Sequence, residues 1–119
     1  MTSPFLPTVL QAPYYAELAA ARAAYLRQES ATAFHHLERA HILGQRWALS
    51  HTHVHMLMLR HGMRTGSLRE VLGQIPRVFL GFLGSLVGRV PIGNTGGANV
   101  PAEQPMPLPT DLEGWLRQA

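Results

Sequence analysis

The stretch HHLERAHILGQRWALSHTHVHMLMLRHG, residues 35–62, decides the fold that this sequence predicts. In its first half, Leu37, His41 and Gly44 recur at intervals of three or four, which is the period of an α-helix. Its last part, MLMLRHG (residues 56–62), contains no β-branched residue and ends in a glycine stop, which also favours a helix. Only residues 45–50 separate the two helices, and short connections make consecutive helices antiparallel neighbours. We therefore expect a helical hairpin here.

Another helix is predicted before this hairpin, over residues 14–28. Tyr14, Leu18 and Tyr25 fall on one face, and the alanines between them favour helix formation. Residues 1–13 contain three prolines, so we expect them to form an extended lead-in.

After the hairpin, the pattern predicts a helix from Leu68 towards Gly88. Ser67 is placed to cap its N-terminus, with Glu70 three residues later to complete a capping box. Pro76 lies inside this segment, and we expect it to kink or divide the helix, because proline removes a backbone donor and clashes with the preceding turn.

Residues 89–109 leave the helical pattern. Their glycine, proline and asparagine content predicts turns and extended backbone, while their apolar residues suggest packing across the bundle. In the stretch GNTGG we expect Asn94, Gly96 and Gly97 to adopt positive φ in tight turns. The stretch is only loosely similar to an anion-cradling loop, since it lacks the lysine and the following helix of a P-loop.

The predicted fold is therefore all-α. Residues 1–119 form a single helical domain, a compact bundle of about four helices with an irregular segment over residues 89–109. A short last helix is expected after Thr110, which is placed to cap it.

The first two predicted helices, over residues 14–28 and 31–44, form what we call the first hairpin, and this hairpin resembles a single tetratricopeptide-like repeat. In AAYLRQESATAFHHLERAHIL, residues 23–43, an aromatic residue (Tyr25) ends the first helix, and a small, a bulky and a small residue (Ala33, Leu37 and Ala40) follow down the second. Glu29 stands in the turn where a glycine is usual, and there is no second copy. The resemblance implies a helical hairpin rather than a peptide-binding repeat array.

The whole chain also resembles a small, uncharacterised bacterial family with a domain of unknown function. The resemblance rests on four motifs in this order: LERAHILGQR, HTHVHMLMLRHG, REVLGQ and GRVPIGNTGGANV. It implies a bacterial origin and provides no activity or catalytic residue.

Composition narrows the possible functions. The net charge is +3 and only 14% of residues are charged, which suggests that the protein hides part of its surface in a dimer, against a partner or at a membrane face. The basic residues are all arginines and are scattered along the chain, so no nucleic-acid partner is expected.

The chain has no cysteine, which excludes disulfides and thiolate zinc sites and fits a reducing, cytoplasmic location. The N-terminus lacks the pattern of a signal peptide.

Histidines are the candidate metal ligands. On a helix, His51 and His55 are i, i+4 neighbours that can bind one ion, and His41 near the end of the preceding helix lies at the same corner. Glu38 shares a face with His41 and is the expected fourth ligand or the residue that orients it. We therefore predict a metal site at His41, His51, His55 and Glu38, suited to Zn, Fe, Ni or Cu.

Other interpretations stay open. The histidines could be satisfied structural residues or pH sensors. The protein could instead be a non-enzymatic helical interaction module that uses the first hairpin and PRVFLGFLGSLVG, residues 76–88, to hold a second copy, a partner or a membrane surface. Catalysis on the metal would need an open coordination position, so the sequence leaves enzymatic activity undecided.

Overall fold

Five helices make up the regular structure in the computed structural model, which describes residues 3–119. No strand occurs in that range, so the predicted all-α fold is confirmed. None of these helices is both long and apolar enough to cross a membrane. The helices are α1 (Thr8–Leu26), α2 (Ser30–Gly44), α3 (Ala48–Thr65), α4 (Leu68–Leu86) and α5 (Thr110–Leu116).

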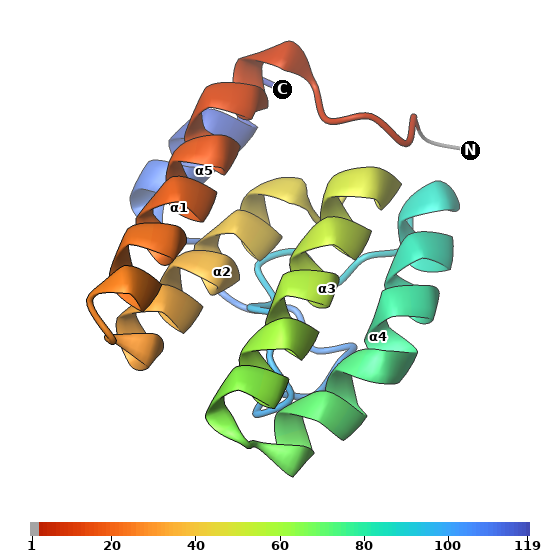
Figure 1. The fold of residues 1–119 in the computed structure, drawn as a ribbon. Helices are drawn as coiled ribbons and strands as arrows, with labels where there is room; N and C mark the ends of the chain where they lie inside the picture. The colour runs from red at the N-terminus through yellow and green to blue at the C-terminus, as the bar shows by residue number, and fades with distance from the viewer. Residues whose placement is uncertain (1–2) are drawn as a thin grey trace.

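The first four helices pack in chain order, each against the next (Figure 1). The short α5 packs on both α1 and α2. Between α4 and α5, the segment of residues 87–109 contains no helix and runs behind α2 and α3 in the view of Figure 1. This segment therefore closes the side of the bundle where α2, α3 and α4 meet.

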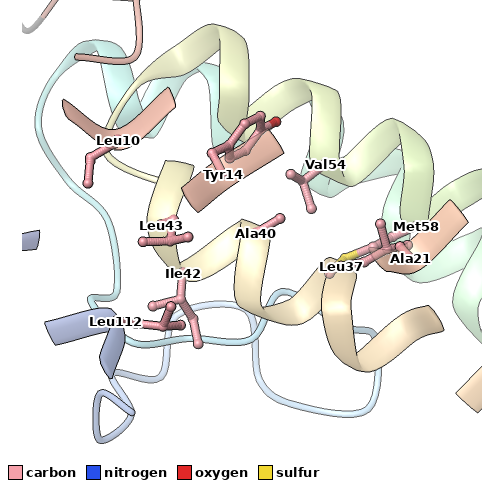
Figure 2. Packing of buried hydrophobic residues seen from close by; sticks show 10 residues of the cluster. All are labelled: Leu10, Tyr14, Ala21, Leu37, Ala40, Ile42, Leu43, Val54, Met58 and Leu112. Atoms are coloured by element: carbon pink, nitrogen blue, oxygen red, sulfur yellow. The ribbon is translucent and has the colours of Figure 1, made fainter. Parts of the chain in front are cut away.

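The apolar core lies between α1, α2 and α3 and is covered at one end by α5 (Figure 2). Small residues let the helices approach closely: Ala24, Ala33 and Ala40 are completely buried. The core cluster consists of Leu10, Tyr14, Ala21, Leu37, Ala40, Ile42, Leu43, Val54, Met58 and Leu112.

The expected lead-in over residues 1–13 is too long. Helix α1 already begins at Thr8 and contains Pro13. Leu10 and Tyr14, one helical turn apart, are both buried in the core, and this burial favours the earlier start. Pro13 removes one backbone hydrogen bond in the second turn of the helix, and the burial of Leu10 and Tyr14 outweighs this loss.

Two serines near the starts of α3 and α4 have different roles. Ser50 does not cap α3; its hydroxyl donates to the carbonyls of Gly44 and Trp47, which ties the end of α2 to the start of α3. Ser67 does cap α4, because its Oγ accepts from the Glu70 N–H at 3.2 Å. The Glu70 carboxylate does not complete the capping box, since it turns inward and accepts from the N–H of Ala98.

Helix α4 is not divided at Pro76 and continues to Leu86. In the GNTGG stretch, the prediction of positive φ holds for Gly96 (φ 86°), whereas Asn94 and Gly97 do not adopt it. Asn94 forms the turn with its side chain instead, because its Oδ1 accepts from the Gly96 N–H at 2.8 Å.

Candidate metal centre

Three histidine side chains meet where α2, α3 and α4 face the irregular segment. The Nε2 atom of His41 lies 3.0 Å from that of His51 and 3.1 Å from that of His55, and the latter two are 2.9 Å apart. All three residues are buried, with 2–4% of their surface exposed. These are the three histidines that the sequence singled out, and their ring nitrogens form the one group in residues 3–119 that could hold a metal ion.

Local structure brings the three rings together. His51 and His55 are one turn apart on α3, and the tight connection after Gly44 places His41 of α2 beside them. Two glycines make room for the rings. A Cβ atom on Gly81 would lie 2.9 Å from Cε1 of His51, and one on Gly96 would lie 2.5 Å from Cδ2 of His41. The backbone at these two glycines therefore packs directly against the rings, and any residue larger than glycine would collide with them.

In two of the rings, the Nδ1 atom forms a hydrogen bond that fixes the ring proton on that nitrogen. His41 Nδ1 donates to the carbonyl of Asn94 at 2.7 Å. His51 Nδ1 lies 2.8 Å from the Oγ of Ser85. Ser85 donates its only hydroxyl proton to the carbonyl of Gln45 and must therefore accept from His51.

The third ring is fixed by an amide. His55 Nδ1 lies 2.7 Å from Oε1 of Gln74, whose Nε2 donates to the Glu70 carboxylate at 2.6 Å and to the Gly96 carbonyl at 2.9 Å. These two acceptors set the orientation of the amide, so its oxygen accepts from His55. All three imidazoles thus carry their proton on Nδ1, and the lone pairs of all three Nε2 atoms point at one another.

The cluster stays neutral at physiological pH. Burial lowers the pKa of His51 to about 3 and that of His55 to about 4. Burial, helped by the other two imidazoles, also lowers the pKa of His41 well below 6.5. No proton is therefore available to relieve the repulsion between the lone pairs, whereas a metal ion would bind all three.

A cavity of about 520 Å³ adjoins the three rings. The side chains on its walls are mainly apolar, and Arg77, Arg89 and Glu103 supply the charged groups. An ion bound to three histidines would have coordination positions left, and the cavity provides space for what fills them. The apolar part of the lining comes mainly from Pro76, Leu80, Val90, Pro91, Ala102 and Pro105.

Glu38, the predicted fourth residue, is not brought into the cluster. Its carboxylate lies 3.5 Å from Nδ1 of His35 on the same helix, and burial raises its pKa. Met56 and Met58 of α3 carry thioether sulfurs, which are soft ligands for copper, but they are not placed with the rings: Met56 is 56% exposed, and Met58 packs in the apolar core. Within the described residues, the group that could hold a metal is limited to three imidazoles.

The other four histidines have structural partners. His36 pairs with Glu17, and His35 lies beside Glu38. His53 and His61 each share a hydrogen bond with a tyrosine hydroxyl of α1. None of these four histidines is fully buried.

The groups that orient the rings were not predicted from the sequence: Asn94, Ser85, Gln74 and, behind it, Glu70. A signal was present in α4. Glu70, Gln74 and Ser85 share one face of this amphipathic helix and are its buried residues, while several of its large apolar side chains are exposed. The polar stripe is the inner face of α4, whereas an amphipathic helix ordinarily turns its apolar face inward, so periodicity alone favours the opposite orientation.

The chain belongs to the DUF3703 family, described as proteins of unknown function, whose model matches residues 8–116. The resemblance to a small uncharacterised family is thereby confirmed. Comparison with curated proteins and with solved structures yields no match. The tetratricopeptide-like character of the first hairpin stays a prediction.

Proposed function

We propose that this protein binds a divalent transition metal ion through the Nε2 atoms of His41, His51 and His55. The observation that carries the proposal is the fixed direction of the three lone pairs: each Nδ1 donates to its own acceptor, so each Nε2 is left as a ligand atom. An ion at about 2.0–2.1 Å from each nitrogen can contact three nitrogens spaced in this way.

The chemistry of the three ligands limits which metal ions fit the site. Three neutral imidazoles suit Zn²⁺, Fe²⁺, Ni²⁺ and Cu²⁺, whereas Mg²⁺ and Ca²⁺ prefer oxygen ligands. A carrier or sensor of such an ion is the simplest function for the site. Catalysis would require in addition that a molecule bound in the cavity reacts at the ion.

The test is the metal content of the untagged protein. Elemental mass spectrometry after growth with Zn, Fe, Ni and Cu available is expected to find close to one ion per chain in the wild type. His41→Ala and His51→Ala are expected to lose it, because two imidazoles alone bind weakly. His53→Ala is the matched control: this histidine lies on α3 between two proposed ligands, is exposed, and faces Tyr14 instead.

Metal retained by His53→Ala and lost from the other two variants would support the proposal. A wild type that takes up no ion, even after reconstitution at neutral pH, would overturn it.

A second candidate function rests on the exposed face of α4. Leu68, Leu72, Ile75, Phe79 and Leu83 follow one another at intervals of three or four and are each 45–69% exposed. No charged residue interrupts this stripe, and soluble monomers rarely expose so continuous an apolar surface. We propose that the stripe binds the same stripe of a second copy, since an uncharged helix face can pair with itself about a two-fold axis.

Sedimentation of the purified protein tests this second proposal. A dimer is expected for the wild type and a monomer for Phe79→Ser/Leu83→Ser. Leu26→Ser is the control, because Leu26 is 79% exposed but lies on α1. A monomeric wild type at high micromolar concentration would exclude the dimer and leave a different partner or a membrane surface as the occupant.

A further inference from the structure

We infer that the cavity beside the three histidines binds a small organic carboxylate, whose charged end is held by the metal ion together with Arg77. This inference rests on the proposed metal function and specifies the ligand class of the same site.

The charge of the site calls for an anion. Three neutral imidazoles do not offset the charge of a divalent ion, so the ion would keep +2 in a buried place. Arg77 lines the same cavity as the three imidazoles and adds a further positive charge there. None of the carboxylates in residues 3–119 forms an ion pair with Arg77. A bound anion would supply the missing negative charge.

Arg77 is held ready to receive such a ligand. Its Nη1 donates to the carbonyl of Gly73 at 2.8 Å and its Nη2 to that of Val100 at 2.9 Å. These two bonds use two of its five N–H groups and anchor the guanidinium between α4 and the irregular segment. A guanidinium fixed in this way can donate its remaining N–H groups to a carboxylate without first losing side-chain freedom.

The walls of the cavity indicate an apolar body behind the carboxylate. Pro76, Leu80 and Val90 line it, and its volume of about 520 Å³ is in the range of small-molecule sites. An inorganic anion would leave most of this apolar space unused. A short fatty or aromatic acid would cover the walls and reach the ion with its charged end.

Glu103 also lines the cavity and is the one residue of opposite charge there. It is exposed, and the structure does not place it with the three imidazoles. If the chain supplied its own anion, Glu103 would be the source, so the experiment includes this residue.

The experiment uses Co²⁺, whose visible spectrum reports its ligands. The full chain is first titrated with Co²⁺ alone, and then the cobalt-loaded protein is titrated with acetate, butyrate and hexanoate. Each acid is expected to change the spectrum saturably, and affinity is expected to rise about two- to fourfold per methylene group, because each is buried against the walls. Butyramide, which has the same body without the charge, is the ligand control.

The variants separate the roles of the charged residues. Arg77→Met is expected to weaken butyrate binding about 10- to 100-fold while Co²⁺ still binds, and Arg77→Lys to recover part of the loss. Arg69→Met on the same helix is the matched control, since this exposed arginine does not line the cavity, and it is expected to stay within about twofold of the wild type. Glu103→Gln is expected to leave butyrate binding intact or strengthen it.

Failure of the two proposals can be distinguished. No cobalt spectrum at all would overturn the metal function itself. If the cobalt spectrum does not change when any of the three acids is added, the proposed carboxylate ligand is overturned while the metal site remains. The same holds if the spectrum changes only when Glu103 is replaced by Gln. Equal affinities for acetate and hexanoate would also contradict it, because an organic ligand would then gain nothing from the apolar walls.

Discussion

Helices α2 and α3 face two different interiors. Towards α1 they bury leucine, alanine, valine and methionine side chains, whose burial stabilises the fold without any ligand (Figure 2). Towards α4 and residues 87–109 they bury the three histidines, surrounded by Gln74, Ser85 and Asn94. The second interior has polar side chains around the rings and an adjoining cavity with mainly apolar walls, and its centre holds three lone pairs that repel one another.

The difference shows how the protein divides stability and function. The apolar interior joins α1, α2, α3 and α5 through their buried side chains. The polar interior holds α4 and the irregular segment through hydrogen bonds around the rings, and a metal ion would turn the repulsion at its centre into an attraction. We expect the two interiors to respond differently to pH, truncation and metal.

The largest expected difference is the response of the metal-free protein to acid. Unfolded histidines bind protons below about pH 6.5, whereas the folded His51 and His55 do so only near pH 3 and 4. The unfolded state therefore takes up more protons, and the stability present above pH 6.5 is lost as the pH falls. With His41 included, the free energy of unfolding is expected to fall by up to about 4 kcal/mol per pH unit between pH 6 and 5.

Urea denaturation at pH 7, 6 and 5 measures this slope. His51→Leu is the control and is expected to reduce the slope by about a third, since it removes one of three groups. A stability that does not change between pH 7 and 5 would show that the rings are already accessible to protons in the folded protein.

Truncation in the apolar interior is the next largest effect. Leu43 is completely buried in the core, and Leu43→Ala is expected to lower the free energy of unfolding by about 2–5 kcal/mol through lost burial and a cavity. Its metal content is expected to equal that of the wild type, because the leucine is part of the other interior. Denaturation with and without a chelator, beside His51→Ala, provides the measurement. Loss of metal from Leu43→Ala at a temperature where it is folded would mean that the two interiors are coupled.

The two interiors also differ in how far the sequence predicts them. Helical periodicity anticipated the hairpin from residue 30 onward and the meeting of His41 with His51 and His55, because the i, i+4 spacing and a short connection leave little freedom. These are local constraints, and they are visible in one stretch of chain.

The partners of the rings depend on contacts that are distant in the sequence. The carbonyl of Asn94 lies 53 residues from His41 along the chain, and no periodicity specifies that approach. The position of the Glu38 carboxylate shows the same limit: sharing a helix face with His41 did not determine which neighbour it would meet, and it lies 3.5 Å from Nδ1 of His35. Pro13 is the opposite case, in which a local signal was outweighed by a distant one. Its low helix propensity favoured an extended segment, but burial of the residues around it extends α1 back to Thr8.

Glycine substitutions sharpen the comparison at the edge of the polar interior. Gly96 has φ 86°, and a Cβ atom there would meet the His41 ring at 2.5 Å, whereas Gly66, with φ 70°, has open space around it. Gly66→Ala is expected to lower the free energy of unfolding by about 1–2 kcal/mol through backbone strain alone. Gly96→Ala is expected to lower it by about 1–3 kcal/mol more and also to reduce metal content. Thermal unfolding and metal analysis of the two variants test this, and equal effects would argue against close packing of the loop on the ring.

The smallest effect isolates orientation from ligation. Gln74→Met keeps a side chain of similar length but removes the oxygen that accepts from His55, so the ring is free to turn or to move its proton to Nε2. Metal affinity is expected to fall about 10- to 100-fold, which corresponds to about 1.4–2.7 kcal/mol, while all three ligands remain. Gln45→Met is the control, since that side chain is equally buried and its Oε1 has no hydrogen-bond partner among the described residues. Competition of each variant with a chromophoric chelator measures the affinity. If both variants bind metal as tightly as the wild type, the rings are oriented by packing, and the polar interior resembles the apolar one more closely than its hydrogen bonds imply.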